Sequence, residues 1–303
     1  MFSGLMPAMV TPFDEHGEVD LRTTEVVIER LIDAGVDGIV ALGSNGEFSH
    51  LTGDERKSFA EEVAKIVDGR VTLVIGVGTS ATKEAVALAR HAEGVGANGV
   101  IIVPPFYWKV GEEALFKHFV AVTESVDIPV LLYNFPMLTG IDLSPGLIAS
   151  IASEYPNVAG LKDTVTEYSH IVNVLREVKP ERPDFVVLAG FEDLILPALL
   201  AGGDGAVSGL SNVAPKLFVD LVRSVDEGDL QKAAQLHRRV LSLMALGECS
   251  DPPVGAIKLA MNKLGVPISP TVRGPALPVP EEAHEKVEGV LREAGLLPVR
   301  EVG

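Results

Sequence analysis

Short apolar segments alternate along the chain with longer amphipathic ones. Eight of the short segments are bounded by glycine, proline or polar residues, and their apolar residues follow one another without polar positions between them. This pattern predicts β-strands buried on both faces, as in a parallel sheet. The predicted strands are residues 5–10, 38–42, 71–76, 99–103, 129–134, 158–162, 185–190 and 205–208.

Helical periodicity fills the intervals between these strands. Apolar residues recur at spacings of three and four in stretches such as 21–34, 54–67, 81–95 and 115–126. Strands that alternate with helices favour a parallel sheet, and eight such strands close a barrel, so the sequence predicts an α/β fold, a (β/α)8 TIM barrel.

Further helical stretches follow the last predicted strand. They cover residues 216–225, 230–246 and 254–264, and a proline-rich turn at 275–280 precedes a final helix at 281–294. We therefore expect a catalytic barrel in residues 1–224 and a C-terminal helical extension, packed on the barrel, in residues 225–303.

A weak internal repeat supports the barrel. Gly35-Val36-Asp37-Gly38, Gly96-Ala97-Asn98-Gly99 and Gly202-Gly203-Asp204-Gly205 each follow a helical stretch and open an apolar run. A glycine that ends a helix and leads into a tight turn gives this pattern.

A doubly wound nucleotide-binding sheet is the main structural alternative. Gly76-Val77-Gly78-Thr79-Ser80-Ala81 follows a strand and opens a helix, as a dinucleotide-binding motif does. The next strand ends in Ile102-Val103-Pro104-Pro105, which lacks the acid that would bind a ribose hydroxyl. We interpret the glycines as a close-packed turn between strand and helix.

Charge and composition narrow the function classes. The chain carries 42 acidic and 25 basic residues, a net charge of −17, so its surface repels nucleic acid and anionic bilayers. We expect neither as a partner. Residues 1–13 carry no basic residue before their apolar stretch, unlike a signal peptide. Cys249, the single cysteine, has no disulfide partner in the chain, which favours a cytoplasmic protein.

Histidine and serine patterns offer little chemistry. The seven histidines lack metal-ligand spacing, and no nucleophile-elbow motif is present. The sequence therefore predicts neither a transition-metal site nor a serine-hydrolase triad.

Lysine is more informative. Lys162 ends the apolar run Val158-Ala159-Gly160-Leu161, at the strand end that opens onto the active-site face of a barrel. Burial lowers the pKa of a lysine, and a neutral amine attacks a carbonyl to form a Schiff base. A structural ion pair with Asp163 or another acid is an equal alternative. Lys258 also has apolar neighbours, but on a helix its stem is expected to snorkel.

Two further strand ends would lie beside Lys162. Tyr133-Asn134-Phe135-Pro136 ends the fifth strand, and its tyrosine is a candidate proton shuttle or simply a core residue. Gly43-Ser44-Asn45-Gly46-Glu47 follows the second strand, and its backbone N–H groups could converge on a carboxylate or form an ordinary turn.

Thr11-Pro12-Phe13, Gly43-Ser44-Asn45-Gly46-Glu47, Tyr133-Asn134-Phe135-Pro136 and Gly160-Leu161-Lys162-Asp163 occur in this order on predicted strands one, two, five and six. Together they resemble the motifs of the dihydrodipicolinate synthase/N-acetylneuraminate lyase family, and the resemblance covers about the whole chain. It implies a pyruvate-dependent class I aldolase on a (β/α)8 barrel with extra C-terminal helices. It also implies a homotetramer, a dimer of dimers, that needs no cofactor.

The resemblance assigns roles to individual residues. Lys162 would form the Schiff base with pyruvate or a 2-keto acid, and Tyr133 would relay protons. Ser44 and Asn45 match loop positions that hold the pyruvate carboxylate, with the Ser44 hydroxyl linking to Tyr133. Tyr107 matches a tyrosine that completes the relay from a neighbouring subunit. The implied substrate-binding positions are Asn45, Val207, Thr164, Gly190, Glu192, Asp193 and Leu138.

The substrate expectation depends on Leu138. Synthases of this family that use aspartate semialdehyde carry an arginine at that position, which pairs with the carboxylate of the second substrate. Leucine cannot do so, so we expect a neutral aldehyde partner. Glu192 and Asp193 match positions that hold polyol hydroxyls in sialic acid lyases, and Thr164 follows the lysine as in sugar-acid aldolases.

The closest likeness is therefore to the 2-keto-3-deoxy sugar acid aldolases, acting on a gluconate or pentonate analogue. The alternatives are dihydrodipicolinate (4-hydroxy-tetrahydrodipicolinate) synthase and, from the loop at 43–47, 4-hydroxy-2-oxoglutarate aldolase. A non-catalytic sensor that binds a 2-keto acid is a third, from another class of function.

Overall fold

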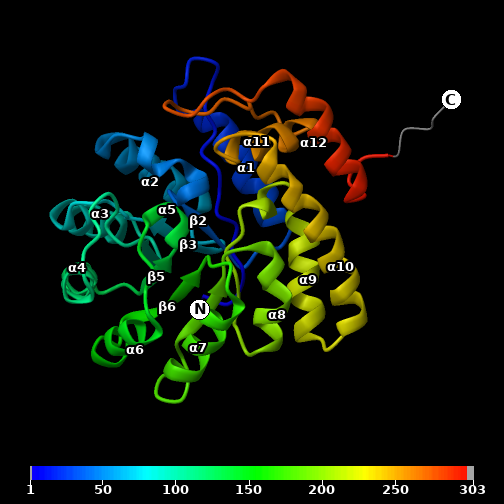
Figure 1. The fold of residues 1–303 in the computed structure, drawn as a ribbon. Coiled ribbons are helices and arrows are strands. Elements are labelled where there is room, and N and C mark those ends of the chain that lie inside the picture. The colour runs from blue at the N-terminus through cyan, green and yellow to red at the C-terminus, as the bar shows by residue number, and fades with distance from the viewer. Residues whose placement is uncertain (1, 299–303) are drawn as a thin grey trace.

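Parallel strands form the centre of the molecule and helices surround them (Figure 1). The computed structural model describes residues 2–298. Its strands are β1 (Gly4–Leu5), β2 (Gly38–Ala41), β3 (Thr72–Gly76), β4 (Gly99–Ile102), β5 (Val130–Asn134), β6 (Val158–Asp163), β7 (Val186–Ala189) and β8 (Gly205–Ala206). They pair in the order β1-β8-β7-β6-β5-β4-β3-β2. The predicted TIM barrel is confirmed.

The ring closes between β1 and β2 through a few bonds. The β1 ladder is shorter than the predicted strand at 5–10, although the Met6 and Ala8 N–H groups still donate to the Ala206 and Ser208 carbonyls at 2.9 Å. Beyond it, Ala8 and Val40 form an isolated parallel bridge, and the Met9 N–H donates to the Val40 carbonyl at 2.9 Å.

Helices cover the outside of the barrel. Around the ring lie α1 (Leu21–Asp33), α2 (Gly53–Val67), α3 (Thr82–Gly94), α4 (Glu112–Thr123), α5 (Pro136–Thr139), α6 (Pro145–Glu154), α7 (Tyr168–Val178), α8 (Ile195–Leu200) and α9 (Pro215–Asp226). The C-terminal part consists of α10 (Leu230–Leu243), α11 (Val254–Lys263) and α12 (Glu281–Glu293). In Figure 1, α10 runs beside α9, and α11 and α12 lie near α1. None of the helices in residues 2–298 has the length and apolarity needed to cross a membrane.

The glycine repeat forms the same turn before three of the strands. Gly35, Gly96 and Gly202 have φ values of 83°, 86° and 98°, the left-handed conformation that glycine tolerates best. The polar residue two positions later accepts a hydrogen bond from a backbone N–H of the neighbouring strand. These pairs are Asp37 with Leu5, Asn98 with Leu73, and Asp204 with Val187, each at 2.8 Å.

The glycines after β3 are explained by packing. A Cβ on Gly76 would lie 2.0 Å from the Leu42 carbonyl oxygen, and one on Gly78 would lie 2.5 Å from Val103 Cγ2. Arg56, buried on α2, donates to the carbonyls of both glycines at 3.0 Å. The segment is therefore the close-packed turn that we inferred.

Side-chain alternation divides the apolar residues into two cores. On β5, Leu131 and Tyr133 belong to a cluster inside the barrel, whereas Val130 and Leu132 belong to the larger cluster between the sheet and the helices. Successive residues of a strand point to opposite faces. Tyr133 therefore points into the barrel near its carboxyl end.

Candidate active site

Lys162 and Tyr133 stand side by side on neighbouring strands. They are register partners in the β5–β6 ladder, and only 4% and 3% of their surfaces are exposed. Lys162 Nζ lies 4.1 Å from the centroid of the Tyr133 ring, a cation–π distance. The structure thus places the predicted nucleophile next to the predicted proton shuttle.

Asp163 does not form the ion pair that sequence left open for Lys162. It faces outward, where Oδ2 lies 2.7 Å from His170 Nδ1 and Oδ1 accepts from Asn134 Nδ2 at 3.0 Å. In the described part of the chain, no carboxylate lies within 4.0 Å of Lys162 Nζ. The Lys162 side chain therefore lines the cavity without an ion-pair partner in the described part of the chain.

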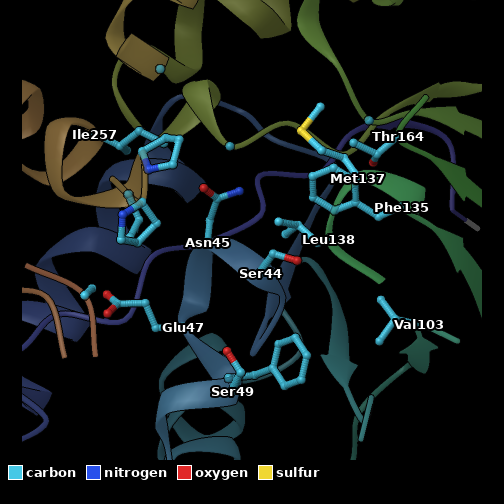
Figure 2. A pocket seen from close by; sticks show the side chains of 18 of the residues that line it. Ser44, Asn45, Glu47, Ser49, Val103, Phe135, Met137, Leu138, Thr164 and Ile257 are labelled. Carbon is cyan, nitrogen blue, oxygen red and sulfur yellow. The ribbon is translucent and has the colours of Figure 1, made fainter. Parts of the chain in front are cut away.

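The turn after β2 brings a hydroxyl to the tyrosine. Ser44 Oγ lies 3.4 Å from Tyr133 Oη, a long hydrogen bond that either group can donate. Ser44 and Asn45 belong to a 3-10 turn, Ser44–Gly46, and Figure 2 shows both side chains at the cavity. The Ser44 link to Tyr133, implied by the family resemblance, is present in the geometry.

A cavity of about 810 Å³ opens over these residues at the carboxyl ends of the strands. Of the predicted site residues, eight line it: Ser44, Asn45, Tyr133, Leu138, Lys162, Thr164, Gly190 and Glu192. Three lie elsewhere: Tyr107 is exposed, Asp193 is exposed, and Val207 is buried in the barrel. The roles of all eleven stay predictions.

Two polar groups in the cavity wall suit a hydroxylated ligand. Thr164 Oγ1 is buried and has no hydrogen-bond partner among residues 2–298. Glu192 Oε1 accepts from Ser208 Oγ at 2.7 Å and from the Leu210 N–H at 3.2 Å. Burial raises the pKa of Glu192. The two hydrogen bonds and the positive charge of Lys162 lower it, but burial has the larger effect. Gly190 is required beside them, because a Cβ there would lie 1.8 Å from Thr164 Oγ1.

Much of the remaining wall was not predicted. Aromatic rings contribute one side: Phe135 stacks on Tyr133 with centroids 5.8 Å apart, and Phe48 meets Phe106 edge-on at 6.2 Å. Phe135 adjoins the Tyr133 motif, so position alone could have suggested it. The C-terminal part supplies Met244, Gly247, Asp251, Pro252, Pro253, Val254, Ile257, Pro275, Ala276 and Leu277. No local pattern marks these residues as cavity residues.

Leu138 lies at the mouth of the cavity with Met137, both on α5, and both are exposed (Figure 2). No charged group is present at this position. Within residues 2–298, no group of three or more histidine, cysteine or acidic side chains is arranged to hold a metal ion.

Comparison with known proteins identifies the family of the chain. Residues 1–294 match the model of the dihydrodipicolinate synthetase family. YjhH of Escherichia coli K12, named provisionally as a 2-dehydro-3-deoxy-D-pentonate aldolase, is 41% identical over 98% of this chain and 99% of its own. The 4-hydroxy-tetrahydrodipicolinate synthase of Thermotoga neapolitana is 37% identical over 98% of this chain and 100% of its own.

A solved structure adds a geometric comparison. YagE of Escherichia coli K12, named provisionally as a 2-dehydro-3-deoxy-D-gluconate aldolase, is 40% identical over 98% of both chains. Its crystal structure in complex with pyruvate matches this fold with a TM-score of 0.96, covering 98% of this chain and 100% of that one.

Proposed function

Because the chain belongs to the dihydrodipicolinate synthetase family of pyruvate aldolases, we propose that it reversibly cleaves a 2-keto-3-deoxy sugar acid to pyruvate and a hydroxyaldehyde. The observation that carries the proposal is the buried Lys162, which has no carboxylate partner among residues 2–298 and contacts Tyr133 at the cavity.

The chemistry starts at Lys162. Its neutral amine attacks the C2 ketone of the keto acid, and loss of water gives an iminium. The proton of the C4 hydroxyl passes to Tyr133 Oη while the phenol gives its own proton to Ser44 Oγ, which releases its proton to solvent. The C3–C4 bond breaks, its electrons flow into the iminium, and the aldehyde leaves. Protonation of the enamine at C3 and hydrolysis then release pyruvate and restore the amine.

Two sets of polar groups in the cavity would orient the substrate. The backbone N–H groups of Ser44 and Asn45 would hold the carboxylate of the keto acid, as a nest of amides holds an anion, while the Gly46 N–H donates to the Gly43 carbonyl within the turn. Thr164 and Glu192 would hold hydroxyls of the sugar chain, since a free hydroxyl and a carboxylate both accept hydrogen bonds. Leu138 offers no charge to a second carboxylate.

Two measurements test the proposal. Sodium borohydride added with pyruvate should reduce the imine and attach the pyruvate fragment at Lys162, as detected by peptide mass spectrometry. A panel of 2-keto-3-deoxy acids should release pyruvate in a coupled dehydrogenase assay. Absence of an adduct, or an adduct at another lysine, would contradict the mechanism. Pyruvate binding without turnover of any panel member would instead favour a sensor.

Condensation of pyruvate with aspartate semialdehyde is the second candidate. The family includes synthases with this activity, and one is 37% identical to the chain. The apolar Leu138 opposes it, because this position offers no cation to the carboxylate of the second substrate. A coupled reductase assay that shows efficient condensation would replace the leading proposal. Cleavage of 4-hydroxy-2-oxoglutarate belongs in the same substrate panel.

A further inference from the structure

A second buried lysine lies beyond the catalytic pair. Lys258 on α11 is fully buried, and its Nζ donates to Glu47 Oε1 at 2.6 Å and to the Thr271 carbonyl at 2.8 Å. The expectation that this side chain snorkels to solvent is wrong. Its ammonium group reaches inward because a buried carboxylate and a carbonyl are available there.

Glu47 connects this lysine to the substrate turn. It directly follows the Ser44–Gly46 turn, and its second oxygen accepts from the Arg273 backbone N–H at 2.9 Å. In Figure 2 the Glu47 carboxylate points away from Ser44 and Asn45. Both carboxylate oxygens of Glu47 are therefore bound by the C-terminal part of the chain.

The N-terminal segment completes the support. The Phe13 ring lies 4.3 Å from Lys258 Nζ and 5.0 Å from Arg273 Cζ, so it faces both cations. Thr11 Oγ1 donates to the Gly46 carbonyl at 2.7 Å. Thr11 and Phe13, conspicuous in the sequence, thus act on the same turn as Lys258.

The backbone of this turn needs such support. Glu47 has a φ of 54° and Leu42, before the turn, a φ of 57°. A left-handed conformation is unfavourable for a non-glycine residue and persists where surrounding contacts impose it. The bonds to the Glu47 side chain provide those contacts on one side of Ser44 and Asn45.

We propose that Lys258 is a positioning residue: through Glu47 it holds the Ser44–Gly46 turn in the shape that binds the substrate carboxylate. The C-terminal extension then contributes to the active site by fixing the position of this turn. This inference rests on the proposed function, which assigns the carboxylate to that turn.

The test must separate positioning from stability. Removal of one member of a buried ion pair leaves an uncompensated charge and destabilises the fold. The double variant Glu47→Gln/Lys258→Met leaves no unpaired charge and retains an amide that can accept from the Arg273 N–H. Lys263→Met is the matched control, because Lys263 lies on the same helix and pairs with Glu288 at 2.9 Å, away from the cavity.

Borohydride trapping at Lys162 is measured at pH 7 over a range of pyruvate concentrations. For the double variant, the half-saturating concentration should rise about tenfold, equivalent to about 1.4 kcal/mol. The kcat for keto-acid cleavage should fall less than the half-saturating concentration rises, because Lys162 and Tyr133 are untouched and Ser44 keeps its hydroxyl. Lys263→Met should match the wild type in both.

Each outcome has a defined meaning. If the wild type traps no pyruvate, the proposed function fails. If the wild type traps pyruvate and the folded double variant half-saturates at the same concentration, the positioning role is overturned. Should the double variant not fold, Glu47→Asp serves, because it keeps a carboxylate charge for Lys258 and shortens the side chain that joins the lysine to the turn. An unchanged half-saturation there also overturns the inference, and a rise that exceeds any fall in kcat supports it.

Discussion

Thr164 Oγ1 is a buried hydroxyl without a partner, next to the lysine on which the chemistry depends. We expect Thr164→Val to lower kcat/KM for the preferred 2-keto-3-deoxy acid about tenfold, the worth of one hydrogen bond to substrate. Stability should not fall, because valine has the same shape and no protein bond is lost. Steady-state kinetics and thermal melts check both statements. Unchanged kinetics would mean that the hydroxyl does not contact substrate.

Tyr133 has two separable contributions. Tyr133→Phe keeps the ring over which Lys162 Nζ lies and removes the hydroxyl that meets Ser44. We expect kcat to fall about 10²- to 10⁴-fold, the usual effect of losing a positioned acid–base group.

The control for this variant is imine formation. Trapping of pyruvate at Lys162 should continue in Tyr133→Phe, since the amine and the turn are intact. Ser44→Ala should lower kcat less, because the tyrosine hydroxyl remains. Wild-type turnover in Tyr133→Phe would show that a group other than Tyr133 transfers the proton.

Between neighbouring elements, a polar network outside the barrel holds the two catalytic strands together. Asn134 on β5 donates to Asp163 on β6 at 3.0 Å. His170 on α7 lies 2.7 Å from Asp163 Oδ2 and 2.8 Å from the Leu143 carbonyl. Both ring nitrogens thus face acceptors, a geometry that suits the protonated imidazole.

That geometry predicts a pH dependence of stability. Burial lowers the pKa of His170, but the hydrogen bond and charge of Asp163, with the Leu143 carbonyl and Asp142, raise it to about 9. A raised pKa stabilises the fold at low pH, and the effect is lost as pH rises from about 6.5 to 9. The free energy of unfolding should fall by roughly 3 kcal/mol over this range.

Urea unfolding at several pH values measures this. The fall should be largely absent in His170→Gln, which cannot gain the proton. His16→Gln is the control, because His16 is exposed and lies beside the exposed Glu15. Parallel profiles for wild type and His170→Gln would remove the histidine as the cause.

Local pattern was sufficient for the elements and insufficient for their long-range contacts. The apolar runs marked all eight strands, because strands buried on both faces leave a continuous signal. The strands predicted at 5–10 and 205–208 were longer than β1 and β8, because the hydrophobic pattern reports which residues are buried and not which residues pair. Lys258 was misjudged for the same reason: its partner Glu47 lies 211 positions away.

For the whole molecule, the main difference from expectation is the contribution of the C-terminal part to the cavity. The division at residues 224 and 225 stays a prediction, and α9 runs across it from Pro215 to Asp226. Leu277 and Ile257 line the cavity together with Lys162. A motif search finds residues that react, whereas residues that enclose a cavity carry only the composition of ordinary apolar segments.

Tyr107 raises the question of assembly. It is 89% exposed with a φ of 85°, and the adjacent Trp108 is 76% exposed, their ring centroids 5.8 Å apart. Two exposed aromatic rings on a strained backbone favour a surface that another subunit covers. The family resemblance implies that Tyr107 serves the active site of that neighbour, in a homotetramer. Sedimentation should then show four chains, and Tyr107→Phe should lower kcat while assembly persists.

Complementation decides whether Tyr107 acts across the boundary. Lys162→Met and Tyr107→Phe chains, each nearly inactive alone, are mixed in equal amounts, dissociated and reassociated. A hybrid pair contains one site with an intact lysine from one chain and an intact tyrosine from the other, so random pairing should restore about a quarter of the wild-type sites. If each tyrosine serves its own chain, no site is repaired and mixing restores nothing. Recovered activity therefore requires a tyrosine donated by the neighbouring subunit.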